Sequence, residues 1–201
     1  MKNNLITAYV KGLGLTAAFV IAINCFLPTG AFGQKGAKST ENCNAECQRD
    51  LARAAAATAQ YHRESSALAD GFFSTQECVA IPNVGAMGVH YVNLARSMNL
   101  DVNAAEPEIL LYEPMANGKM RLVAVEYYAP VLSNGAPWFA PTPPPTIDNP
   151  APVLFGRSFD GPMPGHEAGQ PWHYDLHVWI WRTNPLGLFA RFNPKVSCAN
   201  E

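Results

Sequence analysis

Three residues that can bind a metal ion alternate along one segment of the sequence, His173-x-Asp175-x-His177. Hydrophobic alternation predicts a strand over residues 173–181, so these three side chains fall on one of its faces. Alternate side chains on a strand are about 7 Å apart, and a curved strand can bring them together on one ion. The opposite face carries apolar residues typical of a core: Tyr174, Leu176, Val178 and Ile180.

Two other predicted strands supply residues that could complete such a site. His90 lies in one apolar strand pattern, and Glu126 interrupts the nearly continuous apolar run of another. A carboxylate buried in such a run needs a compensating partner. Imidazole and carboxylate ligands suit Zn, Mn, Fe, Ni and Cu alike, so the pattern predicts a site for a divalent transition metal. The predicted ligands are His90, Glu126, His173 and His177, with Asp175 as a further ligand or as a residue that orients one.

The same residues also have a purely structural interpretation. A histidine on a sheet can be a hydrogen-bonded core residue, and Asp175 can pair with Arg121 or Arg157. Sequence alone leaves both interpretations open.

The loop that leads into the predicted strand carries His166 and Glu167. Either side chain could act as a general acid or base over the site, or be an exposed turn residue. The chain has no Walker A motif, no Gly-x-Ser-x-Gly elbow and no His-Glu-x-x-His, since Gln170 stands where the second histidine would be. The sequence therefore does not establish whether the protein is an enzyme.

The elements that must position these residues indicate an α+β fold. Residues 44–70 are rich in alanine and free of Gly and Pro, which predicts one long amphipathic helix ending at Gly71. An Asn117-Gly118 turn predicts a hairpin between two strands. We expect the long N-terminal helix to pack on a mainly antiparallel sheet. The predicted strands are residues 88–93, 108–113, 120–129, 153–155 and 173–181.

Most of the 17 prolines lie in residues 130–171, which predicts a long surface loop broken by one short strand. All four tryptophans lie at or after Trp138, and strand alternation places Trp179 and Trp181 on the histidine face. This aromatic and proline-rich region supports an alternative function, that of a non-catalytic extracellular or envelope binding module.

The N-terminus predicts export. Residues 1–33 have the charged flank, apolar run and small-residue cleavage site of a signal peptide. Residues 34–43 resemble a flexible linker, and we expect residues 44–201 to form a single domain. The apolar run is short for a membrane-spanning helix, and no later segment is long and apolar enough for one. We therefore expect a soluble secreted or periplasmic protein.

Cleavage would remove Cys25 and leave four cysteines, an even number in a compartment where disulfides persist. Of the three possible connectivities, we favour Cys78 with Cys198 and Cys43 with Cys47. A metal site at Cys43 and Cys47 is the alternative.

Composition excludes two classes of protein. The 14 Lys+Arg residues against 16 Asp+Glu argue against nucleic-acid binding, and 48% hydrophobic residues argue against intrinsic disorder. The partners that this composition still allows are a small molecule or a component of the cell envelope.

Two segments resemble an uncharacterised family of bacterial secreted proteins: residues 85–93 (GAMGVHYVN) and residues 173–179 (HYDLHVW). The similarity covers nearly the whole chain after the signal peptide, and the second segment is its most specific part. The resemblance implies export and a single domain. It implies no activity and assigns no catalytic residue.

Overall fold

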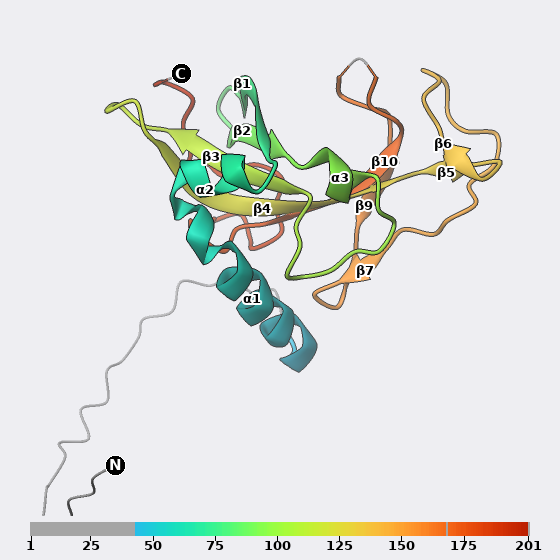
Figure 1. The fold of residues 1–201 in the computed structure, drawn as a ribbon, viewed down its shortest axis with the longest axis horizontal. Helices are drawn as coiled ribbons and strands as arrows, with labels where there is room; N and C mark the ends of the chain where they lie inside the picture. The colour runs from blue at the N-terminus through green and yellow to red at the C-terminus, as the bar shows by residue number, and fades with distance from the viewer. Residues whose placement is uncertain (1–42, 168, 201) are drawn as a thin grey trace, which may run out of the picture. The chain divides into compact units, whose positions relative to one another are not determined.

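The computed structural model describes residues 43–167 and 169–200. The predicted signal peptide 1–33 and all of the predicted linker except Cys43 lie outside the described residues. The centre of the fold is a six-stranded sheet with the order β1-β2-β3-β4-β10-β9, antiparallel at every pairing (Figure 1). Together with the helices on one face, this sheet gives the α+β class that the sequence predicts.

Four predicted strands correspond to strands of the sheet within a few residues at each end. β1 was not predicted, because it is largely exposed and its pairing with β2 is irregular, so it shows no regular alternation. The bounds are β1 Phe73–Ile81, β2 Gly85–Val92, β3 Ile109–Pro114, β4 Met120–Pro130, β9 Asp160–Met163 and β10 His173–Val178.

The predicted turn between β3 and β4 is present. The Gly118 amide donates to the Met115 carbonyl oxygen at 2.8 Å, and Gly118 has φ +72°, a conformation that favours glycine. This hairpin places β3 beside β4 in the centre of the sheet.

The prediction of one unbroken helix over residues 44–70 is wrong in its detail. The segment consists of α1 (Ala45–Thr58), a 3₁₀ turn η1 (Ala59–His62) and α2 (Glu64–Ala69). Buried Tyr61 explains the interruption, because its carbonyl oxygen accepts a hydrogen bond from the Tyr112 hydroxyl of β3 at 2.6 Å instead of continuing the helix. A short further helix, α3 (Leu94–Ser97), follows β2.

The helices α1 and α2 cover one face of the sheet, as Figure 1 shows. Ala54 of α1 and Ala67 of α2 are fully buried there, together with Tyr112 and Tyr127 of the sheet. The opposite face has a smaller core that includes Leu111, Ala124, Tyr128, Trp179 and Val196. A sheet with one well-covered face leaves room for a site on the other.

β10 ends at Val178, which corrects the prediction that both tryptophans share the histidine face. Trp179 lies in the core of that face, but the indole N–H of Trp181 donates to Thr58 Oγ1 of α1 at 3.2 Å. Alternation between the two faces holds only while the chain stays in the sheet, and it is lost where β10 ends.

Two disulfides join Cys78 to Cys198 and Cys43 to Cys47, the connectivity that we favoured. The first links β1 to the C-terminal segment, 120 residues later. The second lies at the start of α1. Because its two sulfur atoms are bonded to each other, they are not metal ligands, which rules out the alternative metal site at Cys43 and Cys47.

The proline-rich region is more ordered than a single loop. It contains two small hairpins and β9, which pairs with β10 at the sheet edge. The hairpins consist of β5 (Leu132–Ser133) with β6 (Ala136–Pro137) and β7 (Val153–Leu154) with β8 (Arg157–Ser158).

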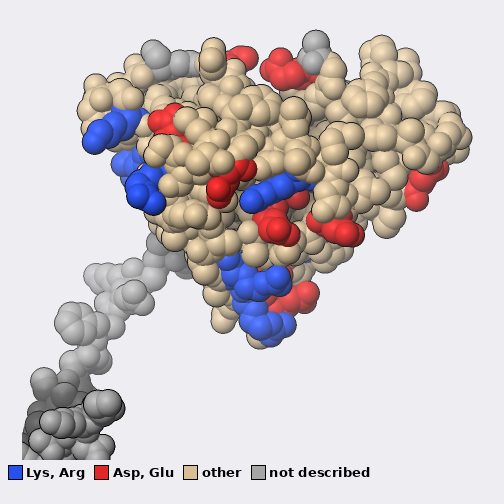
Figure 2. Space-filling model, viewed as in Figure 1, with Lys and Arg blue, Asp and Glu red and all other residues tan. Residues whose placement is uncertain are grey.

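Two properties of the described part bear on partners. None of its helices has the length and hydrophobicity needed to cross a membrane. On the face drawn in Figure 2, acidic and basic side chains lie among each other, without a broad basic area.

Candidate metal centre

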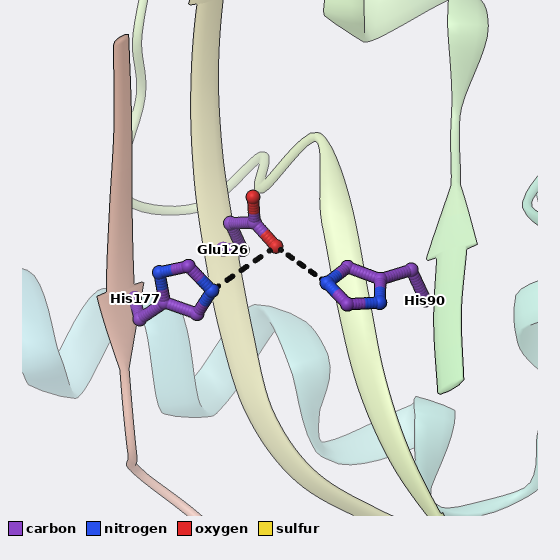
Figure 3. A group of neighbouring side chains, drawn as sticks. All are labelled: His90, Glu126 and His177. Carbon is purple, nitrogen blue, oxygen red and sulfur yellow. Dashed lines mark ion pairs between the residues drawn. The ribbon is translucent and has the colours of Figure 1, made fainter. Parts of the chain in front are cut away.

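Three of the predicted ligands, from three different strands, meet at one point: His90 of β2, Glu126 of β4 and His177 of β10 (Figure 3). The Nε2 atoms of the two histidines are 3.3 Å and 3.5 Å from the same oxygen of Glu126, Oε2. One ligand atom of each residue lies within 4.8 Å of the others.

The register of the sheet explains this meeting. His177 is directly opposite Glu126 in the pairing of β10 with β4. On the other side of β4, Glu126 is opposite Ile109 of β3, whereas His90 is opposite Leu111 of the same strand. The imidazole of His90 therefore crosses over β3 diagonally to reach the carboxylate.

The cluster is buried, and its polar atoms are incompletely satisfied. Side-chain exposure is 7% for Glu126, 2% for His177 and 16% for His90. Glu126 Oε2 and both ring nitrogens of His177 have no hydrogen-bond partner among the residues that the structure describes. Buried polar groups without partners are costly and rare in proteins, so the cluster requires an explanation.

Electrostatics favour the forms in which these residues bind metals. Burial by itself would raise the pKa of Glu126, but the adjacent imidazoles of His177 and His90 outweigh that effect and lower it. Burial lowers the pKa of His177, and the attraction of Glu126 offsets this effect only in part. An ionised carboxylate and a neutral imidazole are the states that coordinate a metal ion.

The spacing also fits one ion. First-row divalent metals bind histidine nitrogen and carboxylate oxygen at about 2.0–2.2 Å, so two ligands of one ion are about 3–4 Å apart. The distances of 3.3 Å and 3.5 Å from Glu126 Oε2 lie in that range.

Two other predicted ligands, His173 and Asp175, do not belong to this group of three. They lie on the same face of β10, but their cross-strand neighbours differ: Asp175 is opposite Tyr128 and His173 is opposite Pro130. Side chains on one strand face stand roughly parallel, so of the three predicted ligands on β10 only His177, which is opposite Glu126, joins its carboxylate.

His173 has its own structural environment. Its ring stacks on Tyr128, with ring centroids 4.9 Å apart, and meets His166 edge to face at 5.0 Å. Its Nδ1 is 3.2 Å from the Pro171 carbonyl oxygen, and burial lowers its pKa. We therefore regard His173 as a packed core residue beside the cluster.

Asp175 is almost completely buried, and one of its oxygens, Oδ1, has no hydrogen-bond partner within the described ranges. One of its two predicted partners, Arg121, pairs with Glu113 instead. Burial, followed by the charge of Glu126, raises the pKa of Asp175 to about 8.

A cavity of about 510 Å³ opens above the cluster on this face of the sheet. His90 and Glu126 form part of its floor, and the loop residues His166 and Glu167 line its wall. The amide N–H groups of His166 and Glu167 both donate to Oε1 of Gln170, at 2.7 Å and 3.3 Å, which holds the loop together. The two predicted acid–base candidates thus border the same cavity as the cluster, although nothing in the geometry assigns them a catalytic role.

Sequence analysis missed most of the residues that surround the cavity. Phe73, Leu94, Met98 and Phe139 line it, and each is 45–60% exposed. Single exposed apolar residues are common on proteins, so Phe73, Leu94 and Met98 carried no signal until the fold brought them together. Phe139 stood out only as a member of the aromatic and proline-rich region.

Glu108, just before β3, is a second buried carboxyl group that sequence reasoning did not identify. Its Oε2 accepts a hydrogen bond from the Tyr128 amide at 3.0 Å, but burial still raises its pKa to about 8. It does not line the cavity.

Comparison of the chain with protein-family models, with curated proteins and with solved structures gives no match.

Proposed function

We propose that the protein binds one divalent transition-metal ion through His90, Glu126 and His177. The main support for this proposal is that two imidazole Nε2 atoms lie 3.3 Å and 3.5 Å from one carboxylate oxygen, Glu126 Oε2. That oxygen and His177 Nε2 have no hydrogen-bond partner in the described part of the chain. Metal coordination would use both of these atoms. An ordinary hydrogen-bonded core would already have satisfied them.

The ligand set indicates what the ion could do. Two histidines and one carboxylate are a set typical of zinc sites that keep a position for water or substrate, and of non-haem iron sites with open positions. His90 and Glu126 line the cavity and His177 does not, so the open side of the ion would face the cavity. This arrangement supports a role in binding or transforming a small molecule.

Export to an oxidising compartment is part of the proposal. Two disulfides in the domain support it, because such bonds persist outside the cytoplasm. The sequence resemblance to bacterial secreted proteins agrees with a periplasmic or secreted location.

The alternative function, a binding module with an aromatic face, has weaker support. All four indole N–H groups donate to acceptors within the domain: Trp138 to Thr142, Trp172 to Ala140, Trp179 to Ala190 and Trp181 to Thr58. Tryptophans whose polar atoms are used internally are less suited to a sugar or peptide platform.

The test is a metal titration of the oxidised, exported protein. We expect wild type to bind one equivalent of Zn²⁺ and Glu126→Gln, which keeps the shape but loses the charge, to bind at least about 100-fold more weakly. Asp175→Asn is the matched control, because it changes another buried carboxyl on the same face and should keep one equivalent. Equal metal content in wild type and Glu126→Gln would show that the proposal is wrong.

A further inference from the structure

The cavity above the candidate metal centre has a mainly apolar lining around a polar floor, with His166 and Glu167 in one part of its wall. Its apolar lining includes Phe73, Val92, Leu94, Met98 and Phe139, whereas the floor carries His90 and Glu126. Its volume of about 510 Å³ is within the range of about 300–1,000 Å³ that is typical of small-molecule sites. The cavity thus has the size and the division of polarity that suit an elongated molecule with one polar end.

The exposure of the walls supports the same conclusion. Leu94 is 60% exposed, Met98 58%, Phe139 55% and Phe73 45%, although all four border one cavity. Large apolar side chains gathered at one concave place are typical of a binding site, since an apolar ligand that covers them removes their surface from water.

The charges around the cavity restrict the polar end. Three carboxylates line it, Glu77, Glu126 and Glu167, and no lysine or arginine is among the described lining residues. Without a metal ion, these carboxylates would repel an anionic ligand. Glu77 and Glu167 are exposed, so water screens their charges. A divalent ion held by buried Glu126 and two neutral imidazoles has an excess positive charge at the ion itself, which an anionic oxygen ligand from the cavity would neutralise.

We propose that the cavity binds a small amphipathic anion, whose apolar body contacts Phe73, Leu94, Met98 and Phe139 and whose carboxylate-like head coordinates the metal ion. This inference rests on the proposed function, because the ion supplies the positive charge that the head requires. It goes further by naming the chemical class of the ligand and its orientation.

The experiment compares three ligands of equal chain length on the oxidised protein, with and without Co²⁺. Fluorescence of N-phenylnaphthylamine, a neutral apolar probe, reports on the walls, and octanoate, octanol and octylamine compete with it. We expect the probe to bind both forms similarly and octanoate to displace it at least about 10-fold better from the Co²⁺ form. Octanol should compete equally in both forms, and octylamine should prefer the metal-free form. Octanoate should also change the visible absorption of bound Co²⁺.

Substitutions distinguish the contribution of the apolar wall residues from that of the metal ion. Phe73→Ser with Phe139→Ser should weaken probe binding about 10-fold and leave Co²⁺ stoichiometry unchanged, because each phenylalanine lines the cavity and is partly exposed. Leu186→Ser, which removes a comparably exposed side chain outside the cavity lining, should change neither measurement.

The outcomes distinguish this inference from the proposed function. Co²⁺ binding with octanoate competition that is the same in both forms would overturn the inference and leave the metal site standing. A lack of Co²⁺ binding would overturn both. Probe binding that weakens as the protein concentration rises would indicate that a second copy fills the cavity, which would also contradict the proposal.

Discussion

His177 is directly opposite Glu126 in the pairing of β10 with β4, and its Nε2 atom lies 3.5 Å from Glu126 Oε2. Both side chains are nearly inaccessible to solvent, so they hold each other in a fixed position inside the sheet. His90 joins them from β2 across the intervening strand β3. The candidate metal centre is therefore part of the rigid sheet, whereas part of the cavity wall, including Phe139 and His166, belongs to loops.

Two buried histidines of one strand should respond differently to the same change. His177→Phe removes a ligand and should lower Zn²⁺ affinity at least about 100-fold, because the ring that replaces it has no donor atom. His173→Phe should keep metal binding near the wild-type level, since this ring stacks on Tyr128 outside the cluster. Calorimetric titration of the two folded variants measures the difference. Equal losses would show that His173 is a ligand after all.

Stability should fall with rising pH because of Glu108. Its folded pKa is about 8 against an ordinary value of 4.5, so the folded state binds more protons than the unfolded state between these values. Its stabilising contribution is full below pH 4.5 and is lost as the pH rises to about 8. Between pH 5 and pH 8 we expect the free energy of unfolding to fall by on the order of 4 kcal/mol less in Glu108→Gln than in wild type. Urea unfolding at pH 5 and pH 8 measures it, and parallel pH profiles of variant and wild type would contradict it.

The two disulfides should differ in their effects on stability. Cys78–Cys198 spans 120 residues and Cys43–Cys47 only 4, so the chain-entropy relation predicts about 5 kcal/mol for the first and about 2 kcal/mol for the second. Replacing each pair with serine and measuring urea unfolding tests this order. A larger loss from the Cys43 and Cys47 pair would refute the loop-length argument.

Gly88 should be irreplaceable by alanine. It has φ +103°, and a Cβ atom there would lie 2.4 Å from the Tyr112 carbonyl oxygen of β3, a backbone atom that cannot move aside without disturbing the sheet. We expect Gly88→Ala to lower the free energy of unfolding by more than about 2 kcal/mol. Gly118→Ala is the control: its φ is +72° but the space is open, so only about 1 kcal/mol should be lost. Similar thermal shifts for both variants would exclude the steric explanation.

Local patterns predicted the parts of the fold that depend on neighbouring residues. Alternation of polar and apolar residues identified β10, because successive side chains of a strand point to opposite faces. The apolar runs identified β3 and β4, which are buried on both faces. The Asn117-Gly118 turn predicted the central hairpin for a similarly local reason. The helix break at Tyr61 was not predictable in this way, because its cause is Tyr112, which is 51 residues away.

The sequence by itself determined the kinds of ligand in the candidate site, a carboxylate within an apolar run and histidines on strands, since burial pattern and residue type are local properties. Only the tertiary structure decided which histidines meet Glu126. Of the two histidines on β10, His177 lies opposite Glu126 and His173 lies opposite Pro130. That choice depends on the register between two strands that are distant in sequence, and register is set by the packing of the whole sheet. The cavity has the same origin, because its apolar residues are scattered through the chain and become neighbours only when the sheet forms.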